Sequence, residues 1–396
     1  MSDLDPFDLA ARQLELDQRA TVQLPALLDR KKARLSRSPH AFLRGSAPLF
    51  YEILARRPDL AEGPADEGFI VGDMHLENVG AYRNEVDDVV FALNDFDDAA
   101  VAPLSLDVLR LSTSVLLAGR GFGCTGAESI ADVRHVIGAY LKALAGGPAP
   151  ATLELVAELM LKVRDRNRKA LLDARAPGDG HGRRRFLRGE RYLDLPPSIE
   201  GRLPALLHAY VAALGPGAKG HAGEWSIEDA AQRVAGTGSL GVRRVALLVR
   251  DHGGEERLLE LKECRAPAVA ALGRTSPRSF PHPGARVVES ACALLASPPR
   301  HLAAVELDGM SFAGRRLFPQ EDKLAVDGLR KGPELDALLA LIGHLLGAAH
   351  LRGLGVLGAP APRAWASAEI SAVIDHAVAL AGLHEAVYLA WSRKQM

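Results

Sequence analysis

Two short segments place acidic side chains where strand-like apolar runs end. The first, VGDMHLENVG, spans residues 71–80 and contains Asp73 and Asn78. The second, LNDFDDA, spans residues 93–99 and contains Asp95. A hard cation such as Mg²⁺ takes a few oxygen ligands together with substrate phosphates. The two segments therefore predict metal–nucleotide chemistry if the fold brings them together.

A β-hairpin would bring them together. Residues 79–82 and 88–93 have the pattern of two strands, and the polar residues 83–87 form the turn between them. Antiparallel pairing around this turn puts Asn78 opposite Asp95 or close to it. Asp73 lies just upstream, so three oxygen-bearing side chains would converge at the open end of the hairpin, opposite its turn.

Phosphoryl transfer divides its work among such side chains: one Asp orients the attacking group, while an Asn and a second Asp hold the metal. We expect Asp73 to be the catalytic base, Asn78 and Asp95 to be metal ligands, and Asp97 to bind a second metal ion. The alternative is that these acids cap helices or turns and that Asn78 is an ordinary turn residue.

A glycine-rich segment lies much later in the chain. GTGSLG, residues 236–241, fits the pattern G-x-G-x-x-G and is followed by the strand-like run VRRVALLV. A dinucleotide fingerprint would be followed by a long helix, so the context favours a glycine flap over phosphates. The residues expected to contact the nucleotide are Gly236, Thr237, Gly238, Ser239 and Gly241.

The next strand-like run, RLLELKE, carries Lys262. A lysine within a buried strand needs an anionic partner, because an unpaired buried ammonium is costly. One candidate for this partner is Glu289, which lies in a helix predicted over residues 284–297. The alternatives are a solvent-facing Lys262 and a local pair between Glu289 and Arg286.

These motifs carry a family resemblance. GDMHLEN resembles the catalytic loop G-D-x-H-x-x-N of aminoglycoside phosphotransferases and other kinase-like enzymes. LNDFDDA resembles their metal-binding segment I-D-F-x-D-A, and APLSLDVLRL (residues 102–111) resembles the following G-D-P-x-x-D-L-A. With the flanking SPHAFLRGS (residues 38–46), the chain closely resembles the bacterial DUF2252 family, which has been grouped with the kinase-like superfamily. The resemblance covers residues 30–355, approximately.

The resemblance implies a cofactor and several supporting residues. It implies ATP with Mg²⁺, for which Mn²⁺ could substitute, and a lysine at position 262 that contacts the α- and β-phosphates. It implies that His75 and Asp107 brace the catalytic loop. Arg44 is expected to contact either phosphate or that loop, with a surface salt bridge as the alternative.

The order of these motifs is unusual. In ordinary kinases the glycine loop and the lysine precede the catalytic loop, whereas here they follow it by more than 150 residues. We therefore expect an α+β, protein-kinase-like, two-lobed fold that is circularly permuted. Cutting a chain at a surface loop leaves core contacts intact, so permutation is physically reasonable. Either helix 334–353 or helix 39–57 would then lead into the catalytic loop.

The surrounding pattern divides the chain into four parts. Residues 1–174 form a helical lobe with the carboxylate hairpin, and residues 175–224 form a linker or insert loop and a helix. Residues 225–322 form a β-rich nucleotide lobe, with turns at His252-Gly253-Gly254 and at Asp308-Gly309. Residues 323–396 add C-terminal helices to the helical lobe. Strands and helices do not alternate regularly, which disfavours a doubly wound sheet.

Bulk properties narrow the choice of partners and compartment. The chain has 396 residues, 48% of them hydrophobic, and a formal net charge of −1, so no global field favours nucleic acid or an anionic membrane. No apolar run reaches the roughly 18 residues of a membrane-spanning helix, and the N-terminal segment has no apolar signal core. Three widely spaced cysteines indicate neither a disulfide framework nor a thiolate metal site. We expect a cytoplasmic bacterial protein.

The most direct interpretation is an ATP- and Mg²⁺-dependent phosphotransferase acting on an unidentified hydroxyl or amine acceptor, either a small molecule or a protein. AMP transfer from an inverted ATP is a variant. A metal-dependent phosphohydrolase using residues 95–97 is a rival, weakened because Ala99 stands where Thr or Val is usual. A non-catalytic nucleotide-binding or interaction module is the other rival.

Overall fold

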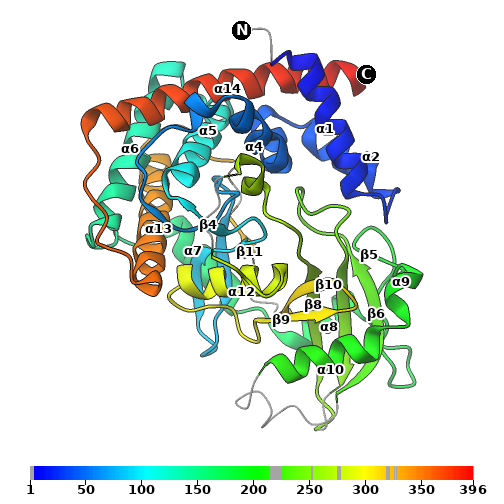
Figure 1. The fold of residues 1–396 in the computed structure, drawn as a ribbon. Coiled ribbons are helices and arrows are strands. Elements are labelled where there is room, and N and C mark those ends of the chain that lie inside the picture. Colours follow the sequence, from blue (N-terminus) through cyan, green and yellow to red (C-terminus); the bar gives the residue numbers. More distant parts are fainter. Residues whose placement is uncertain are drawn as a thin grey trace.

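The computed structural model describes residues 4–214, 225–250, 253–273, 278–317, 322–324, 326 and 328–395. The turn expected at His252 lies partly outside these residues. Helices gather in the upper part of the molecule and a six-stranded sheet forms the lower part (Figure 1). The mixed α+β class expected from the sequence is confirmed.

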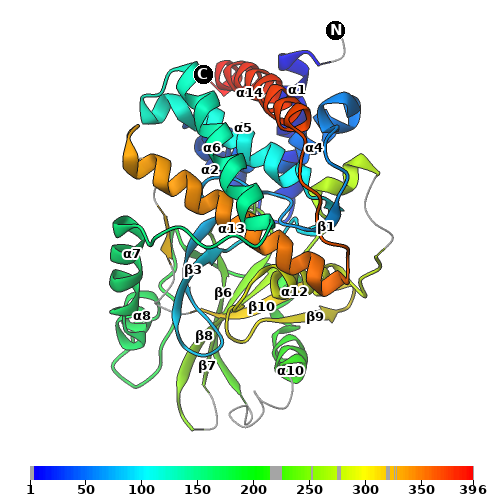
Figure 2. The ribbon, with the colours of Figure 1, turned by 90° about the vertical axis from the view of Figure 1, so that its left-hand side faces the viewer.

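The helical part is built from both ends of the chain, as Figures 1 and 2 show. Its N-terminal elements are α1 (Pro6–Ala20), α2 (Leu27–Leu35), α3 (Pro39–Gly45), α4 (Ala47–Arg56) and the 3-10 helix η1 (Pro58–Ala61). Its later helices are α5 (Ser105–Phe122), α6 (Gly126–Leu144), α13 (Pro333–Leu357) and α14 (Ser367–Gln395). Short helices begin where the sequence provides caps: Ser38 accepts a hydrogen bond from Ala41 N at the start of α3, and Pro39 takes the first helical position.

The predicted carboxylate hairpin is present. Strands β2 (Val79–Arg83) and β3 (Val89–Leu93) pair antiparallel, with Val79 opposite Leu93. Strand β11 (Asp322–Lys323) joins the free edge of β2 from much later in the chain. Strand β1 (Glu67–Ile70) precedes the hairpin and β4 (Ala100–Pro103) follows it. These two strands pair with each other, which fixes both ends of the segment that contains the predicted acidic residues.

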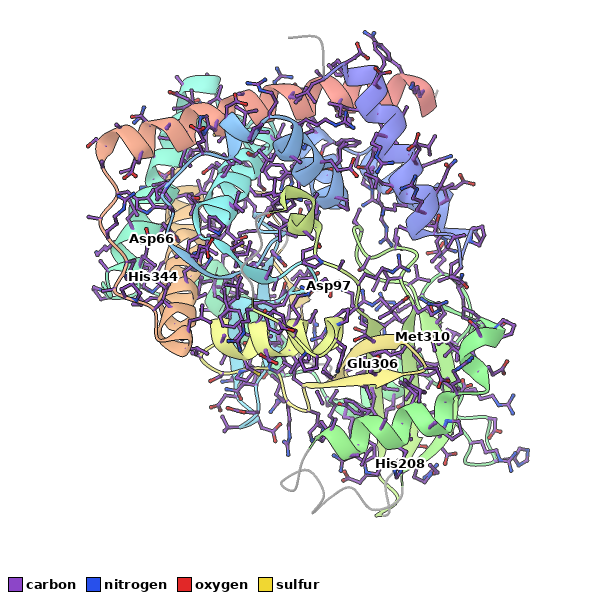
Figure 3. All side chains as sticks on the ribbon, viewed as in Figure 1. Asp66, Asp97, His208, Glu306, Met310 and His344 are labelled. Carbon is purple, nitrogen blue, oxygen red and sulfur yellow. The ribbon has the colours of Figure 1, made fainter. Side chains whose placement is uncertain are left out.

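The six-stranded sheet has the order β5-β6-β7-β8-β10-β9, all antiparallel. Its strands are β5 (Tyr192–Leu193), β6 (Ser226–Arg233), β7 (Arg244–Arg250), β8 (Glu256–Glu263), β9 (Ala303–Leu307) and β10 (Met310–Leu317). The predicted turn between β9 and β10 is confirmed, with positive φ at Asp308 and Gly309. Figure 3 places Glu306 and Met310 on this hairpin. Strand β6 was not anticipated as a separate strand.

The two faces of the sheet are covered by different helices, because side chains along each strand alternate between faces. One face, with Val245, Leu247 and Val249, packs against α9 (Pro197–Glu200) and α10 (Leu203–Ala213). The other face, with Ala246 and Leu248, packs against α8 (Arg168–Arg175) and the segment that follows it. The linker or insert loop expected at the start of residues 175–224 thus packs on the sheet through Ala176, Phe186 and Tyr192.

Three helices connect or flank the two parts. Helix α7 (Glu154–Arg164) leads into α8 beside the hairpin, as Figure 2 shows. Helix α12 (Pro283–Leu294) lies between α13 and strands β9 and β10, and η2 (Ala268–Leu272) packs against α4. Through these contacts the later, β-rich part of the chain packs against the earlier part that contains the carboxylate hairpin.

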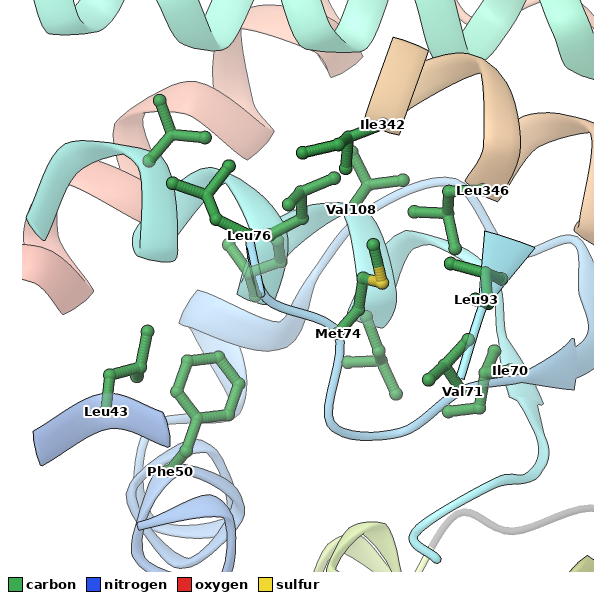
Figure 4. Packing of buried hydrophobic residues seen from close by; sticks show 14 of the residues in the cluster. Leu43, Phe50, Ile70, Val71, Met74, Leu76, Leu93, Val108, Ile342 and Leu346 are labelled. Carbon is green, nitrogen blue, oxygen red and sulfur yellow. The ribbon is translucent and has the colours of Figure 1, made fainter. Parts of the chain in front are cut away.

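Helix α13 runs through the main hydrophobic core (Figure 4). Ile342 and Leu346 of this helix belong to the same cluster as Val71, Met74 and Leu93. The helix was expected to end at Gly353 but continues to Leu357 and ends at Gly358 in the left-handed conformation. Gly353 stays helical because it lets the helix approach Phe69 closely.

Two helices, Pro333–Leu357 and Ser367–Lys394, are long and apolar enough to cross a membrane by length and composition alone. More than half of the apolar part of the first is buried within the fold. A core helix passes the same criterion, so this is weak evidence for a membrane span. The three cysteines are free thiols, and Cys264 alone among them is buried.

Candidate functional site

The hairpin brings Asp73, Asn78 and Asp95 to one place. Asn94 N donates to the carbonyl oxygen of Asn78, so the ladder continues one residue beyond the paired strands. The amide nitrogen of Asn78 donates to the carbonyl oxygens of Asp73 (3.2 Å) and Asp95 (3.3 Å). Asn78 therefore ties the two acidic segments together through its own side chain.

The other end of the Asn78 amide has no such partner. Its Oδ1 atom is buried and accepts no hydrogen bond from any described residue. A buried acceptor without a donor is costly unless something else satisfies it. This orphaned oxygen, next to the backbone of Asp95, fits a cation ligand.

Asp73 is held by a buried arginine that the motifs did not identify. The Nε of Arg110, on α5, donates to Asp73 Oδ1 at 2.8 Å, and a second guanidinium nitrogen also contacts that oxygen. Burial, together with nearby Asp98, raises the pKa of Asp73 to about 7, although Arg110 acts in the opposite direction. The carboxylate is 22% exposed, so it is accessible while its pKa lies near neutrality.

Asp107 holds the backbone at the start of the predicted catalytic loop. Its two carboxylate oxygens accept hydrogen bonds from the backbone nitrogens of Val71 (2.6 Å) and Gly72 (2.9 Å). His350 of α13 contacts the same carboxylate at 3.1 Å, and Tyr51 of α4 donates to the Gly72 carbonyl at 2.6 Å. Both helices considered as the lead-in to the loop therefore touch it.

Gly72 itself can only be glycine. Its φ is +79°, and a Cβ atom there would lie 1.9 Å from the carbonyl oxygen of Asp98. The close approach of these two backbones sets the distance between the acidic segments.

His75 and Arg44 organise the loop through Glu77. The ring of His75 accepts a hydrogen bond from Glu77 N at 3.1 Å, and burial lowers its pKa well below the ordinary value. Arg44 pairs with the Glu77 carboxylate at 2.6 Å. The loop contact expected as one possibility for Arg44 is thus present, and His75 lies in a bracing position.

Lys262 reaches the hairpin from the sheet. Its Nζ lies 3.6 Å from Asp95 Oδ1 and makes a direct ion pair with Asp97. Figure 3 shows Asp97 between the helical part and the sheet. Burial opposes ionisation of Asp95, but Lys262 and Lys323 bring its pKa down to about 2. Burial likewise opposes charge on Lys262, yet the two aspartates raise its pKa.

The expected partnership between Lys262 and Glu289 is not formed. Glu289 pairs with Arg278 at 3.0 Å and is 42% exposed. Arg286, the residue weighed as a local partner of Glu289, is buried and donates to the carbonyl oxygens of Asp97 (2.7 Å) and Ala99. The faces of α12 explain this: Arg286 points to the acidic segment, whereas Glu289 lies on the outer surface.

The glycine-rich segment joins β6 to β7 and lies against the N-terminal helices. Lys31 of α2 donates to the Gly238 carbonyl at 3.3 Å, and Arg34 contacts the Gly236 carbonyl. Gly241 has φ of +94° and packs on the backbone of α1 near Thr21. Of the five predicted contact residues, Gly236 lines the cavity described below, whereas Thr237, Gly238, Ser239 and Gly241 do not.

A cavity of about 910 Å³ lies between the hairpin and the sheet. Its walls come from β2 and β3, the segment 165–167 between α7 and α8, α8 itself, and the strands around Lys262. The lining includes five acidic residues and eight basic ones, namely Arg166, Arg175, Arg191, Arg233, Arg244, Lys262, Arg315 and Lys323. The cavity is cationic in a chain whose net charge is −1, which favours an anionic ligand.

A buried ion network underlies this wall. Glu260, 2% exposed, pairs with Arg244 at 2.7 Å and with Arg233. These arginines hold the pKa of Glu260 well below its ordinary value despite burial, which opposes it. No motif identified these arginines, although Arg244 stands at the start of an otherwise apolar strand, RVALLVR.

The donor set fits Mg²⁺. Among the described residues no group of three or more His, Cys, Asp or Glu side chains could hold a metal. Mg²⁺ needs fewer, since it keeps waters and shares substrate phosphates. Asn78 Oδ1 and the Asp95 carboxylate are suitable oxygens, while Asp97 is engaged by Lys262.

Comparison with known proteins identifies one family. Residues 23–394 match the model of the family described as "Uncharacterized protein conserved in bacteria (DUF2252)". No curated protein and no solved structure matches the chain.

Proposed function

The chain belongs to the DUF2252 family, and we propose that it is an ATP- and Mg²⁺-dependent phosphotransferase acting on a hydroxyl or amine acceptor. One observation carries the proposal: Lys262, from the sheet, approaches Asp95, from the hairpin, to 3.6 Å across a cationic cavity. The two residues are far apart in sequence, and their proximity supports roles as the phosphate-binding lysine and the metal-binding aspartate of a phosphoryl-transfer site.

The proposed fold is a permuted, two-lobed, kinase-like arrangement. Supporting it, β6 and β7 flank the glycine-rich segment and β8, the next strand, carries Lys262. In protein kinases the phosphate-binding lysine likewise lies on the third strand, after the glycine-rich loop. The spacing from Asp73 to Asn78 equals that between Asp and Asn in the kinase catalytic loop.

Nucleotide phosphates would bind to Lys262 and Arg244, with Gly236 at the edge of the cavity. Asn78 and Asp95 would hold Mg²⁺, which supplies neutralisation of the phosphate charge when bound. On binding, phosphate oxygens would replace the aspartates as partners of Lys262, and this exchange would release Asp95 for the metal.

Asp73 would be the base. One carboxylate oxygen is fixed by Arg110, and a pKa near 7 suits proton acceptance at neutral pH. The acceptor oxygen or nitrogen attacks the γ-phosphorus, the bond from that phosphorus to the ADP oxygen breaks, and the acceptor proton passes to Asp73. The products are the phosphorylated acceptor and ADP.

Calorimetry with a non-hydrolysable ATP analogue tests the proposal. We expect binding with Mg²⁺ and much weaker binding without it, because the phosphates would otherwise face Asp73 and Asp95 unscreened. Asp95→Asn should remove the metal dependence, and Asp88→Asn, on the exposed turn of the same hairpin, should keep it. Equal affinity with and without Mg²⁺ in the unsubstituted protein would contradict the metal assignment.

Product analysis separates the two transfer chemistries once an acceptor is found. Phosphoryl transfer yields ADP, whereas AMP transfer yields pyrophosphate, and ³¹P NMR distinguishes them. We expect ADP.

A further inference from the structure

One wall of the cavity carries cations that the proposed phosphotransfer does not use. They come from the arm, by which we mean residues 154–196, containing α7, α8 and β5. The arm leaves the helical part, crosses the sheet face and adds β5 to the edge of β6. Its packing is secured by Leu172, Phe186 and Tyr192, which join the sheet residues in one hydrophobic cluster.

Most arginines of the arm are neutralised by acids. Arg168 pairs with Glu255, Arg184 with Asp173 and Glu256, and Arg188 with Asp194 and Asp229. Each of these pairs holds the arm to itself or to the sheet. Where an acidic side chain is close, an arginine of the arm therefore helps to hold the arm in place.

Within the described part of the chain, Arg175 and Arg191 have no such acidic partner. Both line the cavity, and among the described residues neither side chain has a hydrogen bond or ion pair. Burial and the nearby charges of Arg191 and Arg233 lower the pKa of Arg175. Two cations are thus held close together without an anion, although each would gain from one.

Strand register shows where these cations lie relative to Lys262. Tyr192 is opposite Arg233, and Arg244 is opposite Lys262. The pairing of β6 with β7 places Arg233 beside Arg244. Adjacent strands are about 4.8 Å apart, so the row from β5 to β8 spans roughly 14 Å. The triphosphate chain of one nucleotide is shorter than this row, so phosphates bound at Lys262 would not extend to the β5 end.

We propose that Arg175 and Arg191 form a second anion subsite, which binds a phosphate group of the substrate at the β5 end of the cavity. This inference rests on the proposed function. It adds the substrate class, which is a molecule that carries a phosphate group. Arginine suits the task, since its planar guanidinium matches phosphate oxygens in pairs. The phosphate belongs either to the acceptor or to a distal part of the nucleotide.

Inorganic pyrophosphate titrated into the full-length, metal-free protein is the direct probe. We expect the double variant Arg175→Ala/Arg191→Ala to bind it about 100-fold more weakly, since each charge-assisted contact contributes roughly one tenfold step or more. Arg185→Ala, an exposed arginine of the same arm outside the cavity, should bind like the unsubstituted protein. Lys262→Met should retain most of the affinity.

Unchanged affinity in the double variant, with an unchanged melting temperature, would overturn the subsite. Loss through Lys262→Met alone would overturn it too, because pyrophosphate would then occupy the Lys262 end. If Mg·ATP fails to bind while pyrophosphate still depends on Arg175 and Arg191, the proposed phosphotransferase fails and the subsite stands.

The source of the phosphate follows from a second titration. If the double variant also binds Mg·ATP more weakly, the subsite holds a nucleotide phosphate. If Mg·ATP affinity is unchanged, the subsite holds the acceptor. Both results support the subsite.

Discussion

Replacing Lys262 by Met should affect free metal and metal–nucleotide in opposite directions. In the free protein the Lys262 ammonium pairs with Asp97 and also neutralises Asp95, the carboxylate that would hold the cation. With nucleotide bound, the same ammonium would contact phosphate. The substitution removes a competitor of the metal in the first state and a phosphate ligand in the second.

The magnitude follows from the geometry. Two unit charges 3.6 Å apart attract by about 1 kcal/mol at the dielectric constant of water and by about 5 kcal/mol at an effective value of 20. Asp95 is 40% exposed and Asp97 34%, which favours the lower end of this range. We expect Mg²⁺ alone to bind about 10-fold more tightly to Lys262→Met. Mg·ATP should bind about 10-fold or more weakly, because a charge-assisted contact is lost.

Isothermal titration calorimetry with Mg²⁺, or with Mn²⁺ for a larger signal, measures both affinities. Arg265→Met is the matched control: it removes one positive charge just beyond the same strand, where Arg265 pairs with Glu263 and not with the aspartates. It should leave both affinities nearly unchanged. If Lys262→Met binds free metal no more tightly than the unsubstituted protein, Asp95 is not a metal ligand.

Three further outcomes follow from the site. Asp73→Asn should keep Mg·ATP affinity within about 2-fold by calorimetry but lower turnover by about 10²–10⁴-fold, since a base acts on the acceptor; equal loss of binding would contradict the assignment. The pH profile of kcat/KM should rise through about pH 7, because Asp73 must lose its proton to act and its pKa is raised to that value; a profile flat from pH 5.5 to 8 would exclude Asp73 as the base. Asp107→Ala should lower the free energy of unfolding by roughly 2–6 kcal/mol in chemical denaturation, because it leaves two buried backbone N–H groups without acceptors. Asp88→Ala, on the exposed turn, should change that free energy by less than about 0.5 kcal/mol. Similar stability of the two variants would contradict the bracing role.

Local patterns in the sequence predicted much of this fold. The β2–β3 hairpin and the β9–β10 turn were predictable because apolar alternation and turn residues act over a few positions. Helix α13 was predictable from its apolar face, but its end was not. Gly353 looked like a terminator, and only its packing on Phe69 shows why the helix continues.

The composition of the candidate site was less predictable, because it depends on contacts between distant segments. Asn78 and Asp95 flank one short hairpin and Asp73 lies just upstream, so their spacing alone indicated convergence. Arg110 was hidden within an apolar helix, where no motif marks it as the partner of Asp73.

The partner of Glu289 depended on which way α12 faces. Periodicity within the helix cannot fix that rotation relative to the hairpin. The outcome was an external pair with Arg278, while Arg286 contacts the acidic segment. The arm's coverage of the sheet was equally invisible, since residues 175–198 have little periodicity of their own.

A crystal structure of the protein with Mg²⁺ and a non-hydrolysable ATP analogue tests the central claim most directly. The account predicts nucleotide phosphates on Lys262 and Arg244, with Mg²⁺ bound by Asn78 Oδ1 and the Asp95 carboxylate. Nucleotide bound outside the cavity, or a cavity that holds phosphates with Asn78 and Asp95 free of metal, would contradict it.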